Sequence, residues 1–284
     1  MPDVQNGDYR IHYEITVAGE GPTLVLIAGL GEQIGSVEFP EEQCAIFGQA
    51  GFRVVRLDNR DAGMSKSTRP GQESDYSLAD MADDVAAVVN DLGGQPVHVL
   101  GASMGGFIAR WFAIQHPGLV LTLTVVMSGS GAGPSDDGPQ VDPSVREKNA
   151  GVLADLPRPE AIEKGVEYWR WLWGNGYPFP EQFVRSRVAF AFDRAYEPDG
   201  IARQLMAAVT TAGLWNAQSR ISVPTLVVHG GEDPYFSSAH GEATAARIAG
   251  ATLWADPLMG HIMHHEQWQE LAERVRVLAT GARA

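Results

Sequence analysis

The chain has 284 residues, of which 44% are hydrophobic and 20% are charged, and its formal net charge at pH 7 is −14. This length and composition are typical of one large globular α/β domain with room for an insertion. The acidic balance without a basic run argues against a nucleic-acid-binding surface, and no apolar run is long enough to cross a bilayer. We therefore expect neither nucleic acid nor membrane among its partners.

The beginning of the chain is acidic and polar over residues 1–8 and lacks the pattern of a signal peptide. We therefore expect a cytoplasmic protein, and the sequence is compatible with a monomer or a homodimer. The single cysteine, Cys44, excludes an intramolecular disulfide. We interpret it as a small buried residue on the helix predicted after Pro40.

Predicted strands and helices alternate along most of the chain. Apolar runs bounded by turn residues predict strands over 9–17, 23–27, 52–57, 97–100, 121–127, 225–228 and 251–254. Helical spacing of apolar residues predicts helices over 40–50, 78–92, 107–116, 238–249 and 267–278, with Ser77 placed to cap the second. This alternation predicts a mostly parallel sheet with helices on both faces.

The segment 129–219 interrupts the alternation. It follows a predicted strand with a stretch rich in glycine, serine and proline over residues 128–139, and it then becomes helical in pattern and rich in aromatic residues. Because it lies between two strands of the same sheet, we interpret it as an insertion. The predicted organisation is a core domain of residues 1–128 and 220–284 with an inserted helical cap of residues 129–219.

The strongest chemical signal lies in the stretch 97–116. An apolar strand leads into Gly101-Ala102-Ser103-Met104-Gly105, which fits G-x-S-x-G, and a helix follows. This strand–turn–helix context separates a nucleophile elbow from a chance match in a chain with 32 glycines. Small neighbours permit a strained serine backbone, and the helix N-terminus favours developing negative charge. Ser103 is the predicted nucleophile.

A serine nucleophile needs a base, and the base needs an acid that orients it. Asp233 follows the predicted strand 225–228 and precedes a proline, so it can share the carboxyl edge of the sheet with Ser103. Glu232 is interpreted as a solvated neighbour. Asp136 and Asp137 are the other candidates, and they lie in the polar stretch at the start of the insertion.

The predicted base is His261, which follows a glycine after the last strand. His264 and His265 are rivals within one turn, and we interpret them as polar residues at the start of the last helix. A zinc site is the alternative there, but no third ligand stands at a suitable spacing. We expect no metal and no organic cofactor. The order Ser, Asp, His is the one expected for a nucleophile elbow on this type of fold.

The oxyanion formed at a carbonyl needs backbone donors. The Met104 N–H lies at the start of the helix that follows the nucleophile, and it supplies the first donor. The second is expected from the loop Ala28-Gly29-Leu30-Gly31, with Leu30 as the preferred donor and Gly31 as the alternative. Gly29 is expected to contact the substrate.

These motifs extend from Leu24 to His261 and resemble the α/β-hydrolase superfamily over nearly the whole chain. The turn 58–65, with Asp61 where many relatives have glycine, and Ser103-Met104-Gly105 resemble the branch that contains aclacinomycin-type polyketide methylesterases. The resemblance implies an α/β-hydrolase fold and a serine esterase that cleaves carboxylic esters through an acyl-enzyme. Its loop 28–31 departs from the His-Gly of many members.

The insertion carries the aromatic run Tyr168-Trp169-Arg170-Trp171-Leu172-Trp173. On a helix Trp169 and Trp173 share one face. Over a pocket they would suit an apolar or ring-containing ester; alternatively they pin the cap to the core. Trp215 has the same two interpretations.

Other activities fit the same residues. A cofactor-free haloperoxidase or perhydrolase, a lactonase and a C–C bond hydrolase would use the same triad, and a protein of this fold can also bind a small ligand without turnover. A small-molecule ester is the preferred substrate.

Overall fold

The computed structural model describes residues 2–71, 75–150 and 153–281. Across these residues a nine-stranded sheet has the order β1-β2-β4-β3-β6-β7-β8-β9, with β5 paired to β2. The six strands from β4 to β9 in this order are parallel, whereas β2 is antiparallel to β1, β4 and β5. The strands are β1 Asp3–Asn6, β2 Tyr9–Val17, β3 Thr23–Ile27, β4 Arg53–Leu57, β5 Lys66–Ser67, β6 Val97–Ala102, β7 Val120–Val126, β8 Thr225–Gly230 and β9 Thr252–Asp256.

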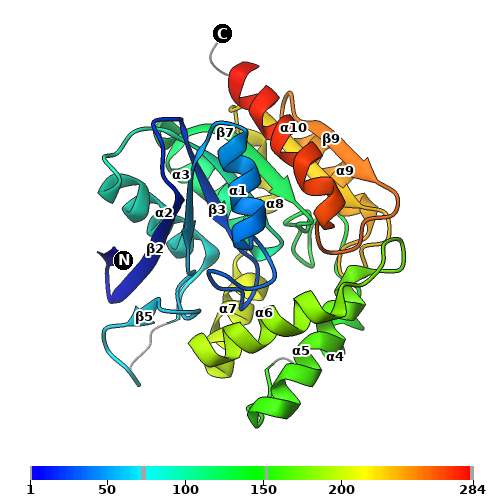
Figure 1. Ribbon diagram of the computed structural model, residues 1–284. Helices are drawn as coiled ribbons and strands as arrows, with labels where there is room; N and C mark the ends of the chain where they lie inside the picture. The colour runs from blue at the N-terminus through cyan, green and yellow to red at the C-terminus, as the bar shows by residue number, and fades with distance from the viewer. Residues whose placement is uncertain (1, 72–74, 151–152, 282–284) are drawn as a thin grey trace.

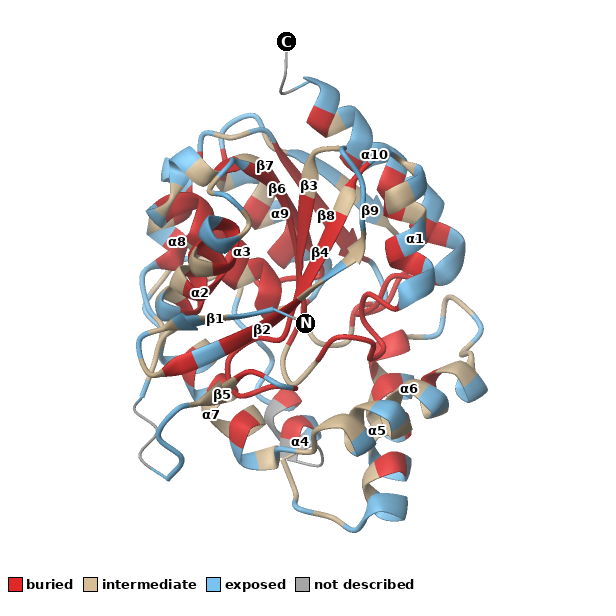
Figure 2. Cartoon of the chain, turned by 60° about the vertical axis from the view of Figure 1, so that its left-hand side comes forward, coloured by how far each residue is buried: buried red, intermediate tan, exposed pale blue. Residues whose placement is uncertain are grey.

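Helices cover both faces of the sheet, as Figures 1 and 2 show. On one face α2 (Leu78–Asp91) packs against α3 (Met104–Gln115), and on the other α1 (Glu41–Gln49) packs against α10 (Trp268–Gly281). Helix α9 (Ser238–Arg247) lies beside β8 and β9.

Strand alternation divides the core between the two faces. In β3, Val25 and Ile27 join the apolar cluster beneath α2 and α3, while Leu24 and Leu26 join the cluster beneath α1 and α10. Successive side chains of a strand point to opposite faces, so a continuous apolar run is what a strand covered on both sides requires. Cys44 is fully buried in the second cluster, as predicted.

The segment between β7 and β8 is helical in the structure. It contains α4 Val145–Ala150, α5 Arg158–Trp173, α6 Glu181–Arg194, α7 Pro198–Thr210 and α8 Leu214–Ala217. Figures 1 and 2 show α4, α5 and α6 grouped at one end of the molecule, away from the C-terminal end of α10. Among the described residues, the structure contains no helix with the length and apolar character needed to span a membrane.

Several features differ from the sequence-based expectations, among them the unpredicted strand β5 and the extension of β8 to Gly230. Strand β1 was not predicted, because it is a polar strand with alternating exposed residues at the edge of the sheet. Helix α3 begins at Met104 rather than at residue 107. The prediction missed its first turn because this turn contains two glycines, which are poor helix formers. Strand β6 continues to Ala102, two residues further than predicted, and so leads directly into Ser103.

Candidate active site

Ser103 occupies the tight turn between β6 and α3. Its backbone has φ 52° and ψ −118°, in the left-handed half of conformational space that side chains other than glycine rarely adopt. The turn is held on both sides, because the Ser103 N–H donates to the Val126 carbonyl at 2.9 Å and its own carbonyl accepts from Gly106 at 3.0 Å. A Cβ on Gly105 would overlap the Ile27 carbonyl oxygen, so this position of the motif must be glycine.

His261 joins the serine to a buried acid. Its Nε2 lies 2.8 Å from Ser103 Oγ, and its Nδ1 lies 2.8 Å from Asp233 Oδ2. The backbone holds the ring in place from the inserted segment, since the His261 N–H donates to the Leu172 carbonyl at the end of α5, at 2.6 Å. The three predicted residues therefore form one hydrogen-bonded chain, although they lie 28 and 158 residues apart in sequence.

The Asp233 carboxylate is buried, and both of its oxygens accept hydrogen bonds. Its Oδ1 accepts the Tyr235 and Phe236 N–H groups at 2.8 and 2.9 Å, which leaves Oδ2 for His261. His229 lies behind it, with Nε2 donating to the Phe236 carbonyl at 2.9 Å and standing 3.6 Å from Asp233 Oδ2. Burial lowers the pKa of His229 and favours its neutral form. The two N–H bonds to Oδ1 fix the direction of the Asp233 carboxylate.

The rival acids have other partners. Asp137 accepts from Trp215 Nε1 and pairs with Arg247, and Asp136 accepts the Gly133 N–H. Glu232 is exposed. None of these three carboxylates has a hydrogen bond to His261 within the described part of the chain.

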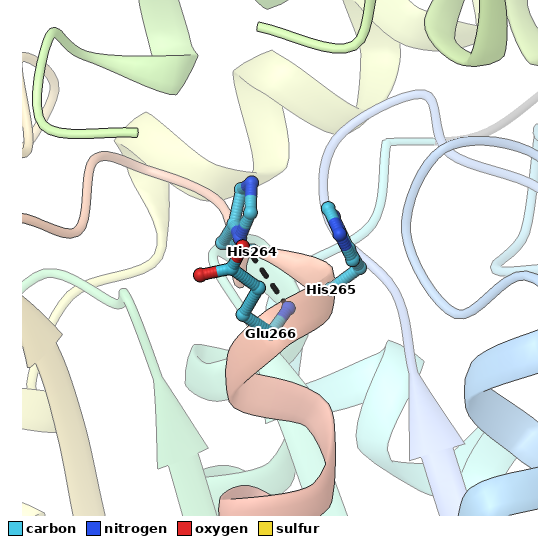
Figure 3. A group of neighbouring side chains, drawn as sticks. All are labelled: His264, His265 and Glu266. Atoms are coloured by element: carbon cyan, nitrogen blue, oxygen red, sulfur yellow. Dashed lines mark hydrogen bonds between the residues drawn. The ribbon is translucent and has the colours of Figure 1, made fainter. Parts of the chain in front are cut away.

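The rival histidines lie together at the start of α10, and Figure 3 shows them with Glu266. Their possible ligand atoms and that of Glu266 lie within 4.8 Å of one another. His264 Nδ1 already accepts the Glu266 N–H at 3.3 Å, and its ring stacks on Tyr177 at a centroid distance of 4.6 Å. His264 thus caps the short helical turn that precedes α10, while His261 contacts Ser103.

Two backbone N–H groups beside Ser103 are free to bind an oxyanion. Met104 is the first residue of α3, where an N–H has no acceptor within its own helix. The Leu30 N–H has no acceptor among the described residues. By contrast, the Gly31 N–H donates to Gln204 Oε1 at 2.8 Å, so the structure favours Leu30 over its alternative.

A cavity of about 160 Å³ opens beside Ser103 and His261. The loop after β3 contributes Leu30 and two acids, Glu32 and Glu38, to its wall. The apolar and aromatic side chains on the wall include Tyr168, Trp169, Leu172, Val188, Ala191, Phe192, Ile201 and Tyr235. The lining is therefore largely apolar, and Asp61, Lys164, Arg187 and Glu197 add charged groups to it.

The four residues predicted to contact substrate are divided by the structure. Only Trp169 lines the cavity. Trp173 packs edge-on against Phe179 and His264, and Trp215 lies under Arg247, 3.6 Å from the guanidinium carbon to the ring centroid. Gly29 is enclosed between Ser103 and Glu38. Helical periodicity places Trp169 and Trp173 on one face, but it does not show where that face meets the cavity.

The sequence analysis did not predict two features beside the site, the Tyr235 ring and the pair of acids Glu32 and Glu38. The Tyr235 ring stacks on the His261 ring at 5.1 Å and an interplanar angle of 23°, and the aromatic pair directly after Asp233-Pro234 was the available signal. Glu32 and Glu38 lie in a loop with no regular pattern. Burial, reinforced by the charge of Glu32, raises the pKa of Glu38 to about 8, and burial raises the pKa of Glu32 to about 7.

The chain is similar to known hydrolases in sequence and fold. A sequence model described as "alpha/beta hydrolase fold" matches residues 22–267. A rhodomycin D methylesterase of Streptomyces sp. (strain C5) is 30% identical over 272 residues, which cover 88% of this chain and 90% of that protein. A 2-hydroxy-6-oxononadienedioate/2-hydroxy-6-oxononatrienedioate hydrolase of Burkholderia vietnamiensis (strain G4 / LMG 22486) is 28% identical over 275 residues, 95% of this chain and 90% of that one.

The likeness extends to solved structures. An esterase from Exiguobacterium antarcticum superposes with a TM-score of 0.78 at 23% identity, and the match covers 99% of each chain. These findings confirm the predicted α/β-hydrolase fold and the resemblance to methylesterases. The expected enzyme class, a carboxylic ester hydrolase, agrees with the methylesterase relative.

Proposed function

This chain belongs to the alpha/beta hydrolase family, and we propose that it is a serine hydrolase that cleaves carboxylic esters through an acyl-enzyme. The observation that supports the proposal most is the continuous contact from Ser103 Oγ through His261 to Asp233, with both hydrogen bonds 2.8 Å long. The methylesterase named among its relatives acts on the same class of bond.

The proposed acylation begins when His261 Nε2 takes the Ser103 proton as Oγ attacks the ester carbonyl. Asp233 holds the Nδ1 proton of the ring and stabilises the imidazolium. The Leu30 and Met104 N–H groups donate to the oxyanion, and losing one such donor costs about 3–4 kcal/mol of transition-state stabilisation. His261 then gives its proton to the leaving alkoxide, and the alcohol departs.

Deacylation repeats the same steps with water. His261 takes a proton from a water molecule, whose oxygen attacks the acyl carbonyl. The second oxyanion collapses when His261 returns the proton to Ser103 Oγ, and the carboxylic acid is released.

The cavity supports a neutral, apolar or ring-containing substrate of small to medium size. The cationic side chains on its wall are already paired: Lys164 with Glu167 at 2.7 Å, and Arg187 with Glu41 and Glu42 at 2.7 and 2.8 Å. Neither cation of the described wall is therefore left to pair with an anionic substrate.

A second candidate is C–C bond hydrolysis, which the Burkholderia relative favours by its name. The name of that relative's substrate denotes a dicarboxylate. Because the cations on the cavity wall already have acidic partners, a dianion finds no free cation there, and we place ester hydrolysis first.

We further propose that residues 129–219 act as a cap over a core domain of residues 1–128 and 220–284. In support, α5 contributes Trp169 to the cavity and the Leu172 carbonyl to the His261 N–H. We also propose a cytoplasmic location for this alpha/beta hydrolase.

Hydrolysis of p-nitrophenyl esters, from acetate to octanoate, tests the proposed function. The wild type and the exposed-site control Ser219→Ala should both release p-nitrophenolate, whereas Ser103→Ala should lose the activity. An unchanged rate in Ser103→Ala would remove the serine mechanism. If the folded wild type hydrolyses none of these esters but cleaves a 2-hydroxy-6-oxo-dienoate, the result would favour C–C bond hydrolysis instead.

A further inference from the structure

Two carboxyl groups lie behind the loop that supplies the Leu30 N–H. Glu38 is 6% exposed, and its Oε2 accepts the Gly29 N–H at 2.7 Å. Glu32 Oε2 in turn accepts the Glu38 N–H at 3.0 Å. No described lysine or arginine forms an ion pair with either carboxyl, and the nearby Arg187 pairs with Glu41 and Glu42 instead.

The Leu30 N–H lies between two anchored neighbours. On one side Glu38 holds the Gly29 N–H, and on the other Gln204 of α7 holds the Gly31 N–H at 2.8 Å. A Cβ on Gly29 would lie 2.9 Å from Glu38 Oε1 and 3.1 Å from Ser103 Cβ, so the Glu38 carboxyl and the nucleophile flank the same residue. Glycine has the most backbone freedom of any residue, and the Leu30 N–H follows it directly. The Glu38 bond restrains that freedom.

We propose that Glu38 is a positioning residue of the oxyanion hole, and that in its neutral form it fixes Gly29 so that the Leu30 N–H faces the oxygen that becomes negative. This inference rests on the proposed ester hydrolysis. A carboxylate at the same place would oppose the developing oxyanion, because like charges in a cavity that excludes water repel strongly. A neutral carboxyl still accepts the Gly29 N–H through its carbonyl oxygen.

The surroundings of Glu38 favour the neutral form. Burial and the charge of Glu32 raise its pKa to about 8, against the opposing effect of the Gly29 N–H. Other titratable groups on the same cavity wall are Tyr168 from α5, Tyr196 after α6, Tyr235 from the loop after β8, and His261. The other charged groups of the wall all have partners: Lys164 pairs with Glu167, Arg187 with Glu41, Asp61 with Arg203 and Glu197 with Lys66.

Three variants test the positioning role at pH 7. Glu38→Gln keeps an acceptor oxygen without charge, Glu38→Met keeps the length without an acceptor, and the exposed-site control Glu20→Met changes nothing near the loop. We expect Glu38→Met to lower kcat by about 10- to 100-fold with KM little changed, since it weakens one oxyanion donor. Glu38→Gln and Glu20→Met should remain within about twofold of the wild type, well below that loss.

An ester-derived trifluoromethyl ketone forms an oxyanion on the serine, so its inhibition constant reports on the oxyanion hole. A residue with only a structural role would not change this constant. The inhibition constant should rise in Glu38→Met by the same factor by which kcat falls. Equal kcat in Glu38→Met and the wild type would overturn the proposal. So would an equal loss in Glu38→Gln and Glu38→Met.

The pH profile tests the neutral form. The wild-type kcat should decline above a pH of about 8 as Glu38 ionises, whereas Glu38→Gln should keep its plateau. The same decline in both proteins would contradict the role of the neutral carboxyl. This comparison also stands if Glu38→Met fails to fold.

Reaction with diethyl p-nitrophenyl phosphate separates this inference from the proposed function. If the folded wild type neither hydrolyses esters nor becomes phosphorylated on Ser103, the proposed function fails. If the wild type is active and the Glu38 variants match it at every pH, only the positioning role fails.

Discussion

The carboxyl edge of the sheet and the inserted segment 129–219 contribute to the site by different physical means. At the edge, backbone constraints fix the reactive groups: a left-handed Ser103, a carbonyl against Gly105 and two N–H bonds to Asp233. The insertion contributes through packing, with Trp169 and other apolar side chains on the cavity wall. The reactive groups are thus placed by local backbone geometry, whereas the cavity wall is shaped by the packing of side chains.

Replacing Asp233 by asparagine should give the largest effect at the edge. The amide cannot hold His261 in the tautomer that accepts the Ser103 proton, and the expected loss in kcat is about 10⁴-fold. The rival acid supplies the control, since Asp136→Asn should retain wild-type kcat in the p-nitrophenyl acetate assay. A loss of less than tenfold in Asp233→Asn would show that another group orients the histidine.

Gly29→Ala should produce the next largest effect. The added Cβ would press on the Glu38 carboxyl and on Ser103 Cβ, and a displacement near 1 Å costs about 10²-fold in rate. Gly118→Ala is the matched control because its Cβ would meet nothing within 4 Å. Steady-state kcat with thermal unfolding checks this expectation, and a fully active Gly29→Ala would mean that the loop tolerates movement.

Substitutions in the inserted segment should change substrate specificity rather than the chemical steps. Trp169→Leu enlarges the cavity, so the ratio of kcat/KM for octanoate over acetate should change by about tenfold, the effect of roughly 1–2 kcal/mol. Trp215→Leu, a matched substitution outside the cavity, should keep the wild-type ratio and lower the melting temperature through its lost contact with Arg247. The same ratio in Trp169→Leu and the wild type would leave Trp169 with a packing role alone.

The smallest effect is expected on pH-dependent stability. Burial raises the pKa of Glu32 in the folded state from 4.5 to about 7, so its contribution is complete below pH 4.5 and is lost as the pH rises through 7. Glu32→Gln removes this dependence. Its melting temperature relative to the wild type should therefore increase from pH 5 to pH 8, by about 2–4 °C for each kcal/mol of differential stability. A constant difference across this range would contradict a raised pKa.

The sequence predicts the edge of the sheet well because its constraints are local. Glycines at fixed distances from Ser103, an acid before a proline and a histidine after a glycine are each visible in a few residues. The contacts that complete the site are not local. The Gly29 bond to Glu38 crosses an irregular loop, and the Leu172 carbonyl reaches His261 from a different part of the chain.

The contacts of the aromatic residues could not be predicted from the sequence either. Helical periodicity groups Trp169 with Trp173, but only the packing of α5 determines that Trp169 meets the cavity while Trp173 meets Phe179. The polar strand β1 was missed because its pairing with β2, rather than its own apolar pattern, defines it.

The central claim is that Ser103 is the activated nucleophile, and covalent labelling tests it most directly. The wild type would be treated with diethyl p-nitrophenyl phosphate, and the modified residue would be located by mass spectrometry of its peptides. We predict one phosphoryl group per chain on Ser103, no such labelling in Ser103→Ala, and much slower labelling in His261→Ala. A folded wild type that remains unmodified, or that is modified at another residue, would contradict the account.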